Sequence, residues 1–95
     1  MQFTQSIQFS GQADPVLDVI STDYNIFVLN HGTGVLVDYV ILSETGTQWE
    51  VGAGELAVGG GLLRSTPSNN HLGTSAKVDF DVGRHVVTVD KMAKS

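Results

Sequence analysis

One segment of the chain shows most clearly how it folds: Gln48-Trp49-Glu50-Val51-Gly52-Ala53-Gly54-Glu55-Leu56-Ala57-Val58-Gly59-Gly60-Gly61-Leu62-Leu63. Apolar residues alternate with glycines in a way that predicts a strand, a turn and a second strand. Because the side chains of a strand alternate between its two faces, Trp49 and Val51 are predicted to share one face, with Trp49 as an anchor of the core. Gly52 and Gly54 have no Cβ and predict a bulge, a sharp bend or a close backbone approach. The glycines at 59–61 suit a hairpin turn.

Short strands separated by turn signals are predicted on both sides of this segment. The candidate strands are residues 3–9, 16–20, 24–29 and 35–42 before it, and residues 76–82 and 85–89 after it. Residues 67–75 are predicted to form a surface loop, and Gly83-Arg84 a turn. No segment shows helical periodicity over about eleven residues or more. The pattern predicts a single all-β domain over residues 1–95, an antiparallel β-sandwich or small barrel, jelly-roll-like, of about seven to nine short strands.

The strand predicted at residues 76–82 alternates without interruption between apolar and charged residues. Its apolar residues are predicted to face the core, which makes Phe80 a core residue together with Ala76, Val78 and Val82.

The N-terminal strand carries apolar residues that the sequence provides no segment to cover. Phe3, Ile7 and Phe9 fall on one face of this strand. An apolar strand without cover is an aggregation hazard unless another chain packs against it. We therefore expect residues 1–9 to pair with a neighbouring subunit through these three side chains. The charged tail, residues 90–95, is a second candidate contact with a neighbour.

The composition bounds the class of protein. Ninety-five residues, of which 41% are hydrophobic and 16% charged, indicate one globular domain. The chain contains no cysteine, and therefore no disulfide, thiolate nucleophile or zinc–thiolate site. The N-terminus lacks the basic flank and apolar run of a signal peptide, and no apolar run approaches the ~20 residues that span a bilayer. We expect a protein that is made in a cytoplasm and has no membrane partner.

Charge is distributed unevenly along the chain. Residues 1–63 contain seven acids and no base, whereas residues 64–95 contain all five bases and three acids, and the net charge is −5. A net negative charge argues against a nucleic-acid partner, because affinity for nucleic acids rests on neutralising phosphates. The asymmetry allows unlike surfaces of neighbouring copies to meet. Alternatively, the two signs mix on the surface of one folded domain.

No pattern of residues predicts catalysis. The spacing of metal-ligand pairs is absent among the three histidines, which are interpreted as turn or surface residues: His31, His71 and His85. Gly52-Ala53-Gly54 lacks the third glycine and the helix of a dinucleotide-binding motif. Asp79 and Asp81 share a strand face, where a solvated surface explains them more simply than a calcium site. We expect no catalytic residue, no cofactor and no metal.

The second half of the chain resembles a module of tailed-bacteriophage virion proteins. That module has a Trp-Glu-Val-Gly-x-Gly strand, a Leu-x-Arg-Thr-Thr strand, a Ser-Ser-Asn-Gly loop, a Val-Asn-Phe-x-x-Gly strand and a final Val-x-Val-Thr strand. The matching segments here are Trp49-Glu50-Val51-Gly52-Ala53-Gly54, Leu62-Leu63-Arg64-Ser65-Thr66, residues 67–75, Val78-Asp79-Phe80-Asp81-Val82-Gly83 and Val86-Val87-Thr88-Val89. The resemblance covers about residues 48–94. Pro67 departs from it, because the module keeps an apolar residue there.

The resemblance implies a role for Arg64, which occupies the position of the arginine in the module. We expect its guanidinium to bind backbone carbonyls or a carboxylate in a fixed fork that lysine cannot reproduce. The candidate carboxylate partners are Glu50, Glu55 and Asp79.

The resemblance also implies a function. It indicates a non-enzymatic virion structural protein, made in the bacterial host cytoplasm and used in multiple copies. The expectation is a capsid decoration (cement) protein that forms a homo-oligomer, a trimer, and binds the major capsid protein or another virion protein. Two alternatives stay open: a neck or tail accessory module that anchors a fibre, and a small carbohydrate-binding β module.

Overall fold

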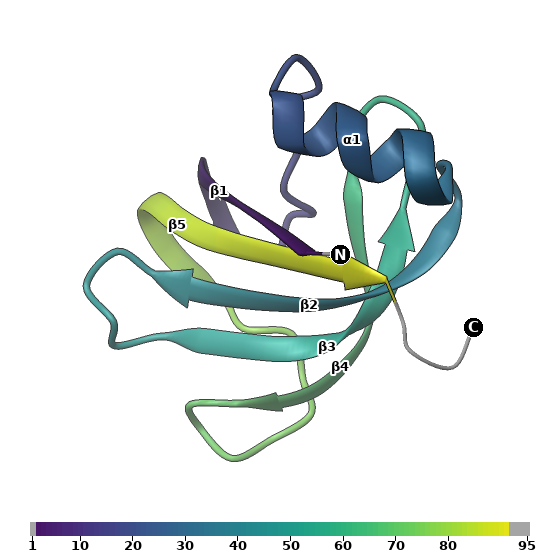
Figure 1. The fold of residues 1–95 in the computed structure, drawn as a ribbon. Coiled ribbons are helices and arrows are strands. Elements are labelled where there is room, and N and C mark those ends of the chain that lie inside the picture. Colours follow the sequence, from purple (N-terminus) through teal and green to yellow (C-terminus); the bar gives the residue numbers. More distant parts are fainter. Residues whose placement is uncertain (1, 92–95) are drawn as a thin grey trace.

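The computed structural model describes residues 2–91, which form one five-stranded antiparallel sheet and one helix (Figure 1). The elements in chain order are β1 (Gln2–Gly11), α1 (Thr22–His31), β2 (Val35–Ser43), β3 (Trp49–Leu56), β4 (Leu62–Asn70) and β5 (Phe80–Lys91). The strand order is β1-β5-β2-β3-β4, so the last strand lies between the first two. Most of the charged tail predicted at residues 90–95 lies outside the described residues.

Within residues 2–91, the sheet has an inner face that other segments cover and an outer face that they leave open. It bends, and α1 lies across the inner face (Figure 1). Loop residues complete this cover, because Leu17 and Val78 are buried with the helix against the sheet. The core residues from the strands and from α1 are Phe3, Tyr24, Phe27, Val37, Tyr39, Ile41, Leu56, Leu62, Phe80, Val87 and Val89.

The expected number of strands, seven to nine, is wrong, and the expected two-sheet sandwich is not seen in residues 2–91. The two strands predicted at 76–82 and 85–89 are one strand, β5, which continues through the predicted turn at Gly83-Arg84. Residues 16–20 contribute only an isolated bridge between Val16 and Gly61. The loop predicted at residues 67–75 begins only after Asn70, because β4 extends to that residue.

A bulge at the start of β5 changes which side chains face the core. Phe80 pairs with Gly11, whereas Gly83 pairs with Phe9, so β5 has one residue more than β1 in this interval. The alternation therefore shifts by one position. Phe80 is buried as predicted, but Val82 is 80% exposed, so the expectation that Val82 faces the core is wrong. Ala76 is exposed as well, because residues 76–79 precede the strand.

The segment predicted as a strand at residues 24–29 is the middle of helix α1, and that prediction is wrong. Ser21 is the N-cap, and its hydroxyl accepts the backbone N–H of Tyr24 at 3.1 Å. Gly32 ends the helix with φ 82°, a conformation that favours glycine. These two caps fix the ends of a ten-residue helix.

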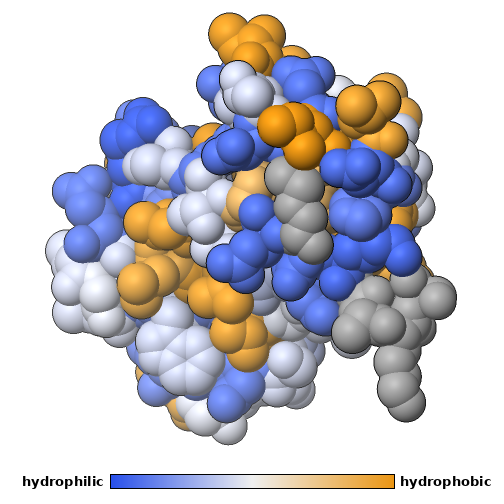
Figure 2. All heavy atoms as spheres, in the orientation of Figure 1, coloured by the Kyte–Doolittle hydropathy of each residue, from blue (hydrophilic) through white to orange (hydrophobic). Residues whose placement is uncertain are grey.

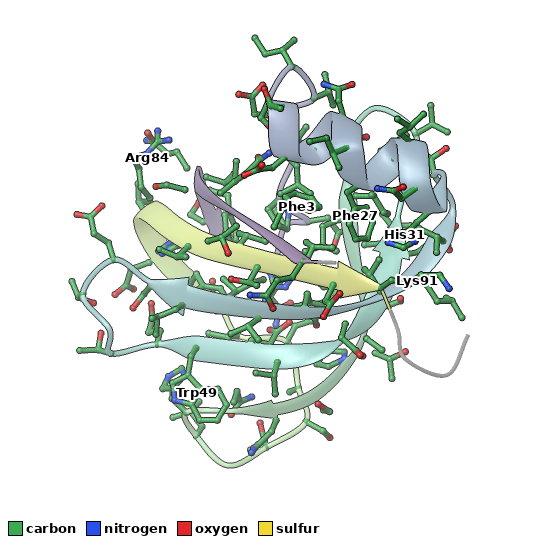
Figure 3. All side chains as sticks on the ribbon, viewed as in Figure 1. Phe3, Phe27, His31, Trp49, Arg84 and Lys91 are labelled. Carbon is green, nitrogen blue, oxygen red and sulfur yellow. The ribbon has the colours of Figure 1, made fainter. Side chains whose placement is uncertain are left out.

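Helix α1 provides the cover that the sequence did not reveal for the N-terminal strand. The ring of Phe3 packs edge-on against Phe27 and Tyr24, with centroids 5.1 Å and 6.1 Å apart (Figure 3). Ile7 and Phe9 pack partly buried against the same core. The expectation that these three β1 side chains lie uncovered is therefore wrong, and their contact with a neighbouring subunit stays a prediction without the exposure that motivated it.

Gly52 and Gly54 allow β3 and β4 to approach closely, as the sequence predicts. The pairing of these strands is irregular between Val51 and Gly52 and between Ala53 and Glu55. A Cβ at Gly52 would lie 2.6 Å from the carbonyl oxygen of Thr66. A Cβ at Gly54 would overlap the carbonyl oxygen of Leu63.

We predict that Gly54→Ala destabilises the domain by at least about 1–3 kcal/mol, because the backbone of β4 must move to admit the methyl group. Gly61→Ala is the matched control, since the nearest atom to its Cβ would be Ala57 Cβ at 3.8 Å. Urea unfolding followed by circular dichroism compares the two variants. Equal unfolding midpoints would show that the close approach at Gly54 is not required.

Candidate functional site

A buried ion pair joins β3 and β4 on the inner face of the sheet. Arg64 and Glu50 are both fully buried. Arg64 Nε donates to Glu50 Oε2 at 3.1 Å, and Arg64 Nη2 donates to Oε1 at 2.5 Å. This is the fork that the sequence predicts, with Glu50 as the partner in place of Glu55 or Asp79.

The other N–H groups of Arg64 bind backbone carbonyls from two distant segments. Nη1 donates to Ala13 O at 2.9 Å and to Gly11 O at 3.4 Å. Nη2 also donates to Val78 O at 2.9 Å. With the two bonds to Glu50, each of the five guanidinium N–H groups has an acceptor. Arg64 thereby ties the end of β1 and the loop before β5 to β4.

Aromatic rings enclose this guanidinium. Its central carbon lies 5.3 Å from the ring centroid of Phe80 and 6.0 Å from that of Phe9. His85 packs against both rings, with centroids 5.1 Å and 4.9 Å away, and its Nε2 lies 2.8 Å from the carbonyl oxygen of Asp81. His85 is only 2% exposed, so its interpretation as a turn or surface histidine is wrong. The bulge in β5 directs it inward.

Glu50 is as fully bonded as its partner. Besides Arg64, its Oε2 accepts the hydroxyl of Tyr39 at 2.6 Å, and its Oε1 accepts the backbone N–H of Val78 at 2.7 Å. Burial by itself would raise the pKa of Glu50, but the hydrogen bonds from Arg64, Tyr39 and Val78 outweigh it and hold the pKa below its usual value. Burial, and then the hydrogen bond to Glu50, raise the pKa of Tyr39. Glu50 is therefore ionised and Tyr39 neutral at pH 7.

This cluster of Arg64, Glu50 and Tyr39, here called the arginine clamp, is closed. Each guanidinium N–H and each carboxylate oxygen is used within the fold. No donor of Arg64 is left over for a ligand. The arginine clamp therefore holds the domain together, and a binding function must be sought on the surface.

Trp49 lies on the outer face of the sheet and is only partly buried, so the prediction that it anchors the core is wrong (Figure 3). Its neighbour Glu50 faces inward to meet Arg64, and alternation then turns Trp49 outward. Val51 shares this outer face, as predicted, and is also partly exposed. The backbone N–H of Trp49 donates to His71 Nδ1 at 3.2 Å, which places the loop after β4 beside it.

The outer face carries an apolar cluster at its centre, here called the outer patch: Val40, Leu42, Trp49, Val51 and Val86. In the sheet, Leu42 of β2 stands between Val86 of β5 and Trp49 of β3, and Val40 stands beside Val51. Val40 is 44% exposed, Leu42 41% and Val86 38%. Figure 2 shows apolar atoms gathered on this face of the molecule.

Polar residues border the outer patch. On β1 the outer positions include Thr4 and Ser6, which are exposed. On β4 the exposed Asn69 lies opposite Val51. At one end of the patch Asp38 pairs with Asp90 across β2 and β5. An apolar centre with a polar rim is the usual composition of a protein–protein interface.

A groove of about 460 Å³ borders β1, which is an edge strand of the sheet. It is lined by residues 5–8 of β1, by Val16, Asp18 and Ser21 of the loop before α1, and by Arg84. Arg84 donates from Nη2 to the carbonyl oxygen of Ser6 at 2.6 Å (Figure 3).

Comparison with known proteins adds no relative: no protein-family model, curated protein or solved structure matches this chain. Residues 2–91 contain no group of three or more histidine or acidic side chains placed to hold a metal ion. Within the same residues, no helix has the length and apolar character needed to cross a bilayer. The outer patch and the groove beside β1 are two surface features that another molecule could contact.

We predict that Arg64→Met lowers the free energy of unfolding by about 3–5 kcal/mol, because it leaves the charge of Glu50 buried without its partner. Lys77→Met is the control for loss of a basic residue. Lys77 Nζ lies 3.9 Å from Asp14 Oδ1 with both side chains 36% exposed, and a surface pair of this kind contributes at most about 1 kcal/mol. Urea unfolding measures both changes. If both variants lower the free energy of unfolding by a similar small amount, the arginine clamp does not have the stabilising role assigned to it.

The low pKa of Glu50 predicts that acid weakens the domain. Because the folded pKa lies below the unfolded value of about 4.3, the stabilisation by Glu50 is complete above about pH 5 and is lost as the pH falls through the folded pKa. Urea unfolding of wild type and Glu50→Gln between pH 7 and about pH 3 tests this. The difference in the free energy of unfolding between wild type and Glu50→Gln should become smaller as the pH falls. A difference that stays constant would show that the pKa of Glu50 is not lowered.

Proposed function

We propose that this chain is a structural protein of a tailed-bacteriophage virion, a decoration protein that binds the outside of the capsid and stabilises it. The resemblance of residues 48–94 to a virion module suggests the particle. The outer patch suggests how the protein acts, because a central apolar surface with a polar rim suits docking on another protein. The proposal places the protein in the virion after synthesis in the bacterial cytoplasm.

The outer patch is the observation that carries this proposal. An antiparallel sheet with one face in water normally places polar residues on that face. The central strand β2 instead places Leu36, Val40 and Leu42 there, with Asp38 as the exception. A monomer gains nothing from apolar side chains at these positions, whereas a docked protein removes them from water. The major capsid protein, or another virion protein, is the proposed partner.

The arginine clamp supports the same proposal through rigidity. The two strands that carry Trp49, Val51 and Asn69 are joined directly beneath the outer patch by the pair of Arg64 and Glu50. A surface that is already ordered loses less conformational freedom on docking, which favours binding. A small domain with this reinforcement can present one fixed face in every copy.

Two other functions are compatible with the same surface. A neck or tail accessory module would dock in the same way but at the single tail vertex. Quantitative mass spectrometry of purified virions separates the two, because a copy number that follows the capsid lattice supports decoration. A carbohydrate-binding module is favoured by the partly exposed ring of Trp49 on an open sheet face. Binding of glycans that quenches tryptophan fluorescence would support that alternative.

We predict that Val40→Glu lowers binding to capsids at least about tenfold, because it places an unpaired charge at the centre of the docking surface. Leu29→Glu is the control, since Leu29 is 84% exposed on α1, which covers the other face. Co-sedimentation with capsids assembled from the proposed partner, the major capsid protein, measures the binding. Equal binding by wild type and Val40→Glu would exclude the outer patch as the docking surface. Absence of binding by wild type, together with absence from virions, would reject the proposed function.

A further inference from the structure

The two edges of the sheet differ in how well they are protected against pairing with another strand. The β4 edge contains Pro67, and its pairing with β3 is irregular at two places. Proline and bulges are features by which proteins block further strand pairing. The β1 edge runs over the ten residues Gln2–Gly11, with no proline and no charged side chain. Its one irregularity lies at its end, between Phe9 and Gly11.

Within residues 2–91, β1 has no backbone pairing on its side away from β5, although Arg84 donates from Nη2 to the carbonyl oxygen of Ser6 at 2.6 Å. Among the described residues, the backbone–backbone hydrogen bonds of residues 2–10 run only to β5. The side chain of Gln5 reaches across to the loop, where its Nε2 donates to Ser21 Oγ at 2.9 Å. The groove of about 460 Å³ lies along residues 5–8. An open edge strand of this length is a template for another strand.

We propose that β1 pairs antiparallel with β1 of a second copy, which joins two five-stranded sheets into one continuous sheet. A foreign strand is less favoured because β1 is self-complementary. It carries no charge that would oppose itself, and its outer positions Gln2, Thr4, Ser6 and Gln8 are polar side chains that hydrogen-bond across paired strands. Antiparallel pairing of identical strands has two-fold symmetry, and the assembly therefore closes as a dimer. This dimer stands in place of the trimer that the resemblance implies.

The dimer would present both outer patches together. The two-fold axis of such a pair is perpendicular to the sheet, so the outer faces of the two copies lie on the same side. Two docking surfaces on one rigid sheet bind a repeating shell more tightly than one, because the second contact forms within the complex. Only this use of the dimer rests on the proposed function, since the pairing itself requires no virion.

The test exchanges charge at two outer positions of β1. One variant carries Thr4→Lys with Gln8→Lys, and the other carries Thr4→Glu with Gln8→Glu. Like charges on paired strands repel, so each variant alone should be a monomer, while wild type is a dimer. An equal mixture of the two should restore the dimer, because opposite charges then face one another. Light scattering coupled to size exclusion measures the mass, and circular dichroism checks the fold.

The matched control carries Ser65→Lys with Thr66→Lys, two exposed residues on the β4 edge, and should remain a dimer. If the lysine variant of β1 does not fold, a monomeric glutamate variant alone still supports the pairing. A monomeric wild type at micromolar concentration would overturn the proposal. Dimeric charge variants, or a mixture that stays monomeric, would also overturn it. Each of these results is obtained without particles, so it leaves the proposed docking on the capsid to its own test.

Discussion

The rest of the structure depends on the buried ion pair between Arg64 and Glu50. A charge placed in an apolar interior is costly unless it is paired and hydrogen-bonded, so both side chains must face the same interior. That requirement sets the facing of β3 and β4 and turns Trp49 outward. It also draws Ala13 and Val78 toward β4, since their carbonyls complete the guanidinium. The domain is thus arranged around a charge pair, and its single tryptophan is left on the surface.

Sequence reasoning succeeded where local chemistry decides the outcome. The β-rich class follows from the alternation of apolar and polar residues, and the hairpin at 59–61 and the close approach at Gly54 follow from glycine geometry. The fork of Arg64 was expected from its position in the resemblance together with guanidinium chemistry. The facing of β3 could not be predicted in this way, because Trp49 and Glu50 compete for the inner face. The apolar residue would win on burial alone. Glu50 faces inward only because Arg64 lies on the neighbouring strand β4. Which residues of β4 lie beside β3 depends on how the sheet is assembled, and the sequence of β3 does not contain that information.

The sequence did not predict the helix or the outer patch, because both α1 and β2 carry apolar residues on two faces. These extra apolar residues obscure the helical period in α1 and the polar–apolar alternation in β2. In α1 the inward residues recur at helical spacing, but Ile26 and Leu29 are apolar and exposed, so the run reads as a buried strand. In β2 the outer Val40 and Leu42 are as apolar as the inner residues, which is typical of a strand covered on both faces. The sequence of β2 therefore did contain a signal for the outer patch, because this strand is more apolar than a strand with only one covered face needs to be.

The position of β5 between β1 and β2 has a consequence for biosynthesis. Gln2 pairs with Asp90, and Val40 pairs with Thr88, so β5, which is synthesised after the other four strands, lies between β1 and β2. The five-stranded sheet cannot be completed until β5 has been synthesised, whereas β2, β3 and β4 can pair before that. Among the described strands, β2, β3 and β4 are neighbours both in the sheet and along the chain. A chain truncated before β5 would therefore lack the strand that joins β1 to the rest of the sheet.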